Sequence, residues 1–287
     1  MSKIVLVAAS AVLVGASVSG CAGTHHSPSE PAPAPTAAPT PPSVSGQWAL
    51  VWADEFDAPG NPDPARWTHD IGYIANQEAQ YYTSRSENVR VEDGLLVIEA
   101  RKEPWMGYAY TSARLKTQGL AQFLYGRVEF RARLPTGRGT WPALWMLGSN
   151  IGQVGWPTCG EIDIMENVGF DPLKIHGTVH TDAYNHTLGN HRSGTVEASP
   201  PPWEDFHVYS MEWTPDRIDI FLDGERYFTF ENEGTGTAAW PFDQPHFIIV
   251  NLAIGGSWGG QRGIDDSLFP HRMFVDYVRV YERKQSP

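Results

Sequence analysis

The sequence is poor in cysteine and in positive charge. Its 287 residues include two Cys, 21 Lys or Arg and 33 Asp or Glu, which gives a formal net charge of -12. Two cysteines cannot build a disulfide framework, and no Cys-x-x-Cys spacing indicates a zinc ribbon. A chain this acidic is repelled by phosphate backbones, so we expect no nucleic-acid partner. No apolar run is long enough to cross a bilayer as a helix.

Aromatic residues, by contrast, are abundant. The chain has 11 Trp, 11 Tyr and 12 Phe, and every Trp lies between Trp48 and Trp258. With 41% hydrophobic and 19% charged residues, the composition is typical of a globular protein. Flat aromatic rings pack against the C–H faces of sugars. An acidic, Trp-rich and Cys-poor chain therefore favours a carbohydrate partner.

The first 21 residues predict an export signal. Lys3 precedes an apolar stretch from Ile4 to about Val18, and small residues lead to Cys21; the stretch is too short for a membrane span. Residues 18–21 resemble the lipobox of bacterial lipoproteins, which implies removal of residues 1–20 and acylation of Cys21. We expect a lipoprotein anchored to a membrane of the cell envelope, at the outer membrane or cell surface in a Gram-negative cell. The alternative is an ordinary secretory signal with an incidental Cys.

A linker follows the predicted lipidation site. Residues 22–46 contain seven Pro, five Ala, four Ser and three Thr. Such a segment cannot bury enough apolar surface to fold, so we expect residues 21–46 to be an anchor followed by a semi-extended spacer. The remaining residues, 47–287, suit a single β-sandwich domain.

The pattern of this domain is that of β-strands. Residues 128–134 alternate apolar with charged side chains, and Asp93-Gly94 and Asp223-Gly224 are hairpin turn signals between β-rich runs. We find no window of twelve residues with helical periodicity and caps. Many short strands in one long domain predict an all-β fold, a jelly-roll β-sandwich of two packed antiparallel sheets.

The most informative segment, residues 160–166, reads GEIDIME. In an extended strand Glu161 and Asp163 share a face, where each raises the pKa of the other. Glu166 would point to the opposite face, so we predict a β-bulge near Met165 that returns it to the side of Glu161. The two Cα atoms would then lie roughly 13 Å apart. Leaning side chains could bring the carboxyls to the ~5–5.5 Å that retaining glycoside hydrolysis requires. A solvated acidic face or a calcium site is the alternative.

The same segment resembles the signature of glycoside hydrolase family 16, in the bulged form of laminarinase-like endo-β-1,3-glucanases. The similarity covers most of the domain, in particular residues 52–56, 110–114, 139–145, 176–180, 251–256 and 275–281. It implies a concanavalin A-like jelly roll with a substrate cleft across its concave sheet. It also implies that Glu161 is the nucleophile, that Glu166 is the general acid/base and that Asp163 tunes their protonation.

Further residues are candidates for binding sugar. Trp141, Trp145, Trp156 and Trp258 are possible sugar platforms, although any of them could be a core residue; position within the family motifs favours Trp141, Trp145 and Trp258 for the cleft. The resemblance places His180 near the acids as a polar contact.

A polar stretch and one arginine complete the substrate-binding candidates. In the stretch that resembles the family's substrate-contacting segment, alternation puts Asn76, Glu78, Gln80 and Tyr82 on one face. Asn76 and Arg114 are the best polar binding candidates. An ordinary polar sheet face is the alternative for both.

Metals and thiols are expected to play no part in the chemistry. His176 and His180 lie some 13 Å apart in a strand, too far to share one zinc ion, and His176 is expected to serve structure. The resemblance implies a structural calcium held by Glu55, the Gly94 carbonyl and Asp276, although an ion pair or a capped turn explains the same acids. Cys159 is expected to be a small buried filler without a disulfide partner. We expect catalysis to need no cofactor.

The leading hypothesis is a monomeric endo-acting enzyme that cuts β-1,3-glucan with retention of configuration. The same fold and acids could instead act on mixed-linkage β-glucan or a galactan, or could transfer the sugar to another sugar hydroxyl. From another class comes a lectin-like binding lipoprotein. That hypothesis needs no acid pair, so Glu161 and Glu166 count against it.

Overall fold

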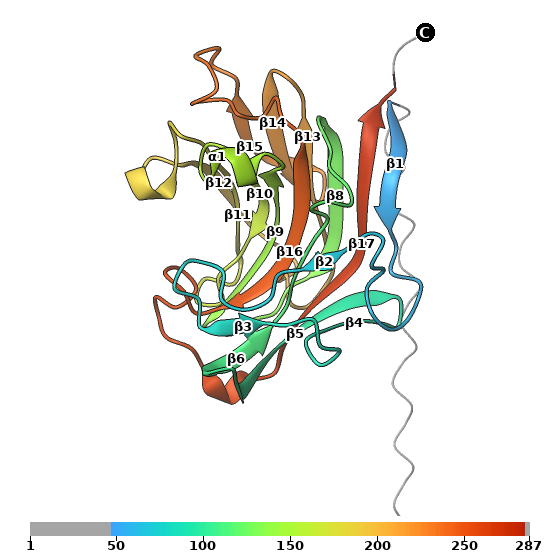
Figure 1. The fold of residues 1–287 in the computed structure, drawn as a ribbon, viewed down its shortest axis with the longest axis vertical. Helices are drawn as coiled ribbons and strands as arrows, with labels where there is room; N and C mark the ends of the chain where they lie inside the picture. Colours follow the sequence, from blue (N-terminus) through green and yellow to red (C-terminus); the bar gives the residue numbers. More distant parts are fainter. Residues whose placement is uncertain (1–46, 285–287) are drawn as a thin grey trace, which may run out of the picture. The chain divides into compact units, whose positions relative to one another are not determined.

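The computed structural model describes residues 47–284. The predicted signal peptide, Cys21 and the linker lie outside the described residues, and the proposed boundaries of all three segments remain predictions. Nearly all regular structure from 47 to 284 is strand (Figure 1). The exceptions are one short helix, α1 (Ile151–Val154), and two 3-10 turns, η1 (His186–Leu188) and η2 (Asp266–Leu268). Over these residues no helix has the length and apolarity to span a bilayer.

The described strands form two sheets. The larger contains β1 (Trp48–Asp54), β3 (Gln80–Tyr82), β4 (Val89–Glu92), β5 (Leu95–Trp105), β6 (Tyr108–Ser112), β8 (Gly126–Arg133), β13 (His207–Trp213), β14 (Arg217–Leu222), β15 (Glu225–Glu231) and β17 (His271–Arg283). Its strands run in the order β15-β14-β13-β8-β17-β5-β6-β3, with β1 beside β17 and β4 beside β5. All of these pairs are antiparallel except β3 with β6.

The smaller sheet carries the segments singled out in the sequence. It contains β2 (Thr68–His69), β7 (Arg114–Lys116), β9 (Thr140–Gly148), β10 (Glu161–Glu166), β11 (Lys174–His180), β12 (Arg192–Glu197) and β16 (His246–Ile254). The order is β12-β11-β10-β9-β16-β7-β2, and every neighbouring pair is antiparallel. The expected sandwich of two sheets is confirmed (Figure 1).

Period-two alternation assigns each strand of the smaller sheet an inner and an outer face. On β9, Leu144 and Met146 are fully buried in the core between the sheets, while Trp141 and Trp145 point outward into a cleft. Inward residues of the larger sheet, among them Val278, complete the same core. Burying these apolar side chains contributes roughly 1.5–3 kcal/mol each. The core thus fixes which side chains of the smaller sheet face outward.

Both predicted hairpins are present. Asp93 and Gly94 join β4 to β5 with φ of 54° and 74°, and Asp223 and Gly224 join β14 to β15 with φ of 51° and 87°. A two-residue turn with positive φ at both positions matches the right-handed twist of the strands that it connects, and Asp-Gly tolerates that conformation.

Candidate active site

The strand with the three acids is bulged, as predicted. Along β9, Asp163 pairs with Trp145 and Met165 pairs with Leu144, so Ile164 has no Cα partner there. It has none on β11 either, because the register jumps from Asp163 to Glu166. The extra residue shifts the alternation by one position. As a result Glu161, Asp163 and Glu166 all line one cleft, whereas a regular strand would point Glu166 into the core.

A tyrosine from the opposite sheet supports the bulge. The Tyr227 hydroxyl, from β15, donates a long hydrogen bond of 3.4 Å to the carbonyl oxygen of Ile164. Gly177 lies opposite the bulge, and a Cβ at that position would lie 2.9 Å from the Tyr227 hydroxyl. No pattern in the sequence distinguishes Tyr227. A glycine inside a strand signals close approach of another group, so Gly177 was the available clue.

The cleft across the outer face of the smaller sheet has a volume of about 880 Å³. It is lined by outward-facing residues of β9, β10, β11 and β16 together with flanking loops. All of the predicted catalytic and substrate-binding residues contribute to this lining: Asn76, Arg114, Trp141, Trp145, Glu161, Asp163, Glu166, His180 and Trp258. The structure therefore brings together side chains spread over most of the domain.

Each outer acid accepts a hydrogen bond from a tryptophan. The indole Nε1 of Trp156 donates to Glu161 Oε2 at 2.9 Å, and that of Trp141 donates to Glu166 Oε1 at 2.9 Å. An indole N–H is only a donor, so it favours the ionised form of the carboxyl that it contacts. Trp156, for which cleft and core were equally expected, lies in the cleft and orients the predicted nucleophile.

The middle acid is the least compensated of the three. Asp163 is 3% exposed, and its Oδ2 has no hydrogen-bond partner among the described residues. His180 lies beside it, with Nε2 3.5 Å from Asp163 Oδ2 and 3.8 Å from Glu161 Oε1. Burial, with a smaller contribution from His186 and His191, lowers the pKa of His180 to about 3. The imidazole is therefore neutral and supplies no balancing charge.

Burial raises the pKa of all three acids. For Asp163 the pKa lies well above its usual range, because of burial first and then repulsion from Glu161 and Glu166. For Glu161 burial and the charge of Glu166 raise the pKa, against smaller opposing effects of Trp156 and Arg114. For Glu166 burial raises the pKa and the Trp141 hydrogen bond lowers it. The site thus retains protons near neutrality, as a general acid requires.

A second group of residues fixes Trp145. Its indole Nε1 donates to Asn251 Oδ1 at 2.8 Å, and the guanidinium of Arg114 lies 4.7 Å from its ring centroid. Arg114 Nε in turn lies 2.9 Å from Asp70 Oδ2. Trp145 is thus held by Asn251 and Arg114 and presents an aromatic wall to the cleft. Asn251 and Asp70 were not identified as site residues from the sequence.

The opposite end of the cleft has a different aromatic group. Trp141 and Trp258 pack edge to face with ring centroids 5.6 Å apart, and His176 packs against Trp258 at 4.8 Å. His176 lines the cleft together with them. His176 thus supports Trp258 within the cleft, and the expectation that it serves structure stays a prediction. Outward alternation on β11 places it on the same face as His180.

The polar stretch after residue 75 only partly behaves as expected. Asn76 and Glu78 line the cleft. Gln80 and Tyr82 are fully buried, where Gln80 Oε1 accepts from the backbone N–H of Ile254 and the Tyr82 hydroxyl accepts from Asn251. The prediction that all four contact sugar is wrong for these two. Asn76 has a φ of 58°, so regular alternation does not run through the segment.

The residues expected to hold calcium are paired with arginines. Glu55 accepts two hydrogen bonds of 2.7 Å from Arg279, and Asp276 accepts one of 2.7 Å from Arg131. A cation beside these carboxylates would have to displace both guanidinium groups. The donor set, with Gly94 in its turn, does not fit the ion as arranged, and no step below depends on calcium.

Cys159 is fully buried and packs with Leu147, Phe247 and Ile249. Burial, followed by repulsion from Glu161, raises its pKa to about 12, so it is not a thiolate near neutrality. The expected role as an apolar filler agrees with this environment.

Two half-buried glutamates on a bulged strand, in an aromatic cleft of a β-sandwich, define the class of glycoside hydrolases that work through an acid pair. Comparison with known proteins gives the family: the model of glycosyl hydrolases family 16 matches residues 76–279. The chain belongs to this family.

Individual relatives agree with the assignment. The chain is 56% identical over 244 residues to a β-glucanase of Rhodothermus marinus, covering 82% of this chain and 85% of the relative. The solved structure of the laminarinase from Rhodothermus marinus is 54% identical, with a TM-score of 0.81 over 83% of this chain and 98% of that one. The structure of SCLam, a non-specific endo-β-1,3(4)-glucanase, is 49% identical, with a TM-score of 0.79 over 85% of this chain and 95% of that one.

Proposed function

We propose that the protein is an endo-acting β-1,3-glucanase that hydrolyses its substrate with retention of configuration. The observation that carries the proposal is the bulge at Ile164, because it brings Glu161 and Glu166 to the floor of one cleft. The Rhodothermus β-glucanase and laminarinase support the choice of substrate. The cleft is open, and Trp and polar side chains form its walls. Such a cleft suits an internal stretch of a long polysaccharide chain.

The first half-reaction uses both glutamates. Glu166 donates its proton to the glycosidic oxygen while a carboxylate oxygen of Glu161 attacks the anomeric carbon. The bond to the leaving sugar breaks, and a covalent glycosyl-Glu161 ester remains. In the second half-reaction Glu166, now a carboxylate, removes a proton from water, whose oxygen displaces Glu161 from the anomeric carbon. Two inversions give net retention, and neither step needs a cofactor.

Electrostatics links the two roles. The charge of Glu166 raises the pKa of Glu161, so a proton on Glu166 removes this repulsion. One proton on the acid therefore makes it easier for the nucleophile to be ionised. The Trp156 hydrogen bond and the field of Arg114 favour the same charged state of Glu161.

The proposal is tested with laminarin. We expect the purified protein to release reducing ends from internal positions, so that chain length falls faster than monosaccharide accumulates. Proton NMR at early times should show the β-anomer as the first product. A first product of α-configuration would contradict the two-step mechanism, and binding of laminarin without any cleavage would favour the lectin-like alternative.

Mixed-linkage β-glucan is a second candidate substrate, because the related SCLam structure is that of a non-specific endo-β-1,3(4)-glucanase. A panel of laminarin, mixed-linkage glucan and a β-galactan distinguishes these substrates by kcat/KM. Products longer than the starting oligosaccharide would identify transglycosylation.

We also propose that the protein is exported, that acylation of Cys21 anchors it to a membrane, and that it is a monomer. Cys21 lies outside the described residues. Loss of membrane association in the Cys21→Ser variant tests the anchor.

A further inference from the structure

Three side-chain atoms in the cleft point at one another without hydrogen bonds of their own. Glu161 Oε2 is occupied by the Trp156 indole, which leaves Oε1 free. Asp163 Oδ2 is buried and has no partner among the described residues. His180 Nε2 faces both oxygens, at 3.8 Å from Glu161 and 3.5 Å from Asp163. Within residues 47–284 this is the one group of three potential metal ligands whose ligand atoms all lie within 4.8 Å of one another.

These spacings match a tetrahedral metal. Zinc binds carboxylate oxygen and imidazole nitrogen at about 2.0–2.2 Å, which places two ligands of a tetrahedron about 3.4 Å apart. The observed 3.5 Å and 3.8 Å are close to this spacing, and all three ligand atoms lie within 4.8 Å of one another, so metal binding would draw the two carboxyls together. The cleft side of the group is open, so a water can take the fourth position. Three protein ligands with one open position are a common zinc arrangement.

The charge of the group also suits a cation. Neither Glu161 nor Asp163 forms an ion pair with Lys or Arg in the described part of the chain. An imidazole ring nitrogen is a common metal ligand. Two carboxylates can balance the charge of Zn²⁺, so its binding would displace no other cation.

We propose that Glu161, Asp163 and His180 form a zinc site inside the catalytic cleft, and that Zn²⁺ bound there reversibly inhibits the enzyme. A zinc ion coordinated by Glu161 Oε1 prevents that carboxylate from attacking the anomeric carbon. The ion also occupies space that the sugar needs. His180 Nδ1 has no hydrogen-bond partner among the described residues. Outer partners of zinc-bound His typically contribute ~10–100-fold in affinity. Their absence here makes the site weaker than a structural zinc site, as reversible inhibition requires.

Binding is measured with the metal alone on the full chain. Titration calorimetry with Zn²⁺ gives the affinity, and Co²⁺ reports geometry through the visible absorption of a four-coordinate site. We expect the His180→Gln variant to lose zinc affinity by ~10-fold or more and to lose the cobalt bands. Asp163→Asn should do the same. His176→Gln is the matched control, because His176 lines the same cleft outside the proposed ligand group.

Two outcomes overturn the inference. Either the wild-type protein fails to bind Zn²⁺, or the ligand variants, folded as judged by circular dichroism, bind it as tightly as the His176→Gln control does. The measurement uses no substrate, so it stands or falls separately from glucan hydrolysis. A β-1,3-gluco-oligosaccharide should lower the apparent zinc affinity if both occupy the cleft. Unchanged zinc affinity with the cleft saturated by sugar would contradict the inhibitory part of the proposal.

Discussion

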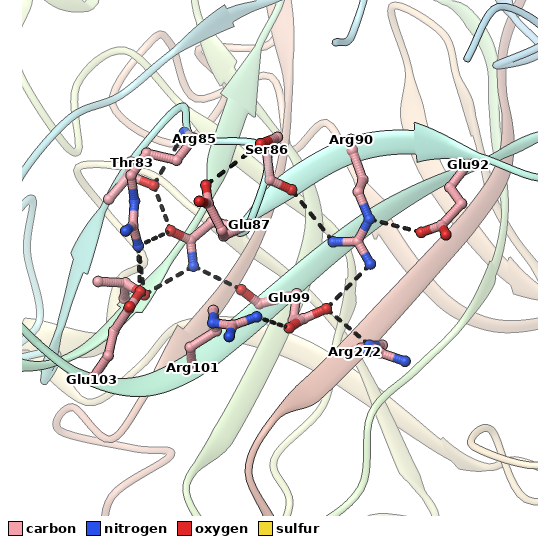
Figure 2. A network of polar contacts seen from close by, with 12 residues as sticks. Thr83, Arg85, Ser86, Glu87, Arg90, Glu92, Glu99, Arg101, Glu103 and Arg272 are labelled. Carbon is pink, nitrogen blue, oxygen red and sulfur yellow. Dashed lines mark hydrogen bonds and ion pairs between the residues drawn. The ribbon is translucent and has the colours of Figure 1, made fainter. Parts of the chain in front are cut away.

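Two buried acids on opposite faces of the sandwich have opposite surroundings. Glu99, on the outer face of the larger sheet, is 2% exposed and contacts the guanidinium groups of Arg90, Arg101 and Arg272 (Figure 2). Asp163, on the outer face of the smaller sheet, is 3% exposed and has no Lys or Arg partner among the described residues; the neutral His180 lies 3.5 Å away, and Glu161 and Glu166 add repulsion. Both sites thus remove a carboxyl group from water. Arginine side chains pair with it at Glu99, and no arginine or lysine pairs with it at Asp163.

The difference shows how the active site can be recognised. A buried charge is costly unless it is paired, and Glu99 follows that rule. Asp163, Glu161 and Glu166 depart from it together, in one cleft, with their pKa values raised by burial and, for Asp163 and Glu161, by the neighbouring acids. A cluster that is unfavourable for stability persists where proton transfer and nucleophilic attack need it. Buried acids alone do not identify the active site. Buried acids that lack a positively charged partner do.

The largest expected effect comes from removing the reactive carboxyls. Glu161→Gln and Glu166→Gln should each lower kcat/KM on laminarin by about 10³-fold or more, because each removes a group that acts directly on the scissile bond. Glu99→Gln should leave kcat/KM within about 2-fold of wild type at a temperature where the variant is folded. Reducing-end assays measure all three. Near-normal hydrolysis by either cleft variant would refute the assigned roles.

The second prediction concerns stability and has opposite signs at the two sites. Glu99→Gln should destabilise the fold by about 2 kcal/mol, because it leaves Arg101 and Arg272 without a carboxylate partner and Arg90 with Glu92 alone. Asp163→Asn should raise Tm at pH 8, because folding then no longer transfers an ionised carboxyl from water to a buried site that disfavours its charge. The pKa of Asp163 is raised on folding, so stability is lost as pH rises above its unfolded value, and the gain in Tm should vanish near pH 3.5. Differential scanning calorimetry at the two pH values tests both signs; a lower Tm for Asp163→Asn at pH 8 would contradict the account.

The sequence predicted one of these two sites and not the other. The spacing of the acids predicted the bulge, because period two is a local property of β10, whereas the cleft was implied by the family resemblance. The partners of Glu99 come from β4, β5 and β17, and only the sheet order brings Arg90 and Arg272 beside it. The same holds for Asn251 and Tyr227 at the active site. Long-range register, not local pattern, decides these contacts.

Removing the indole hydrogen bonds to Glu161 and Glu166 should have a smaller effect, a shift in the pH dependence of kcat/KM. The Trp156 bond lowers the pKa of Glu161, so Trp156→Phe should raise it and move the acidic limb of the kcat/KM profile to higher pH. The Trp141 bond lowers the pKa of Glu166, so Trp141→Phe should move the alkaline limb to higher pH. The nucleophile must be charged and the acid protonated, so the first change narrows the active range and the second extends it. Identical profiles for the two variants would show that the acid roles are not separated in this way.

The smallest expected effect tests how far the site depends on the opposite sheet. Tyr227 touches no reacting group, and its hydroxyl contacts the bulged carbonyl of Ile164 at 3.4 Å. We therefore regard it as a positioning residue. Tyr227→Phe keeps the ring beside Gly177 and removes one weak hydrogen bond, worth about 1 kcal/mol.

If this bond holds Glu166 in register with Glu161, kcat should fall by about 3- to 5-fold while KM stays unchanged, since the walls formed by Trp145 and Arg114 are untouched. The matched control is Tyr209→Phe, a fully buried tyrosine of the larger sheet that lies in the core away from the cleft lining. An equal fall in kcat for both variants would assign the effect to general loosening of the core. A fall confined to Tyr227→Phe would show that a residue of the larger sheet helps to set the spacing of the two carboxyls.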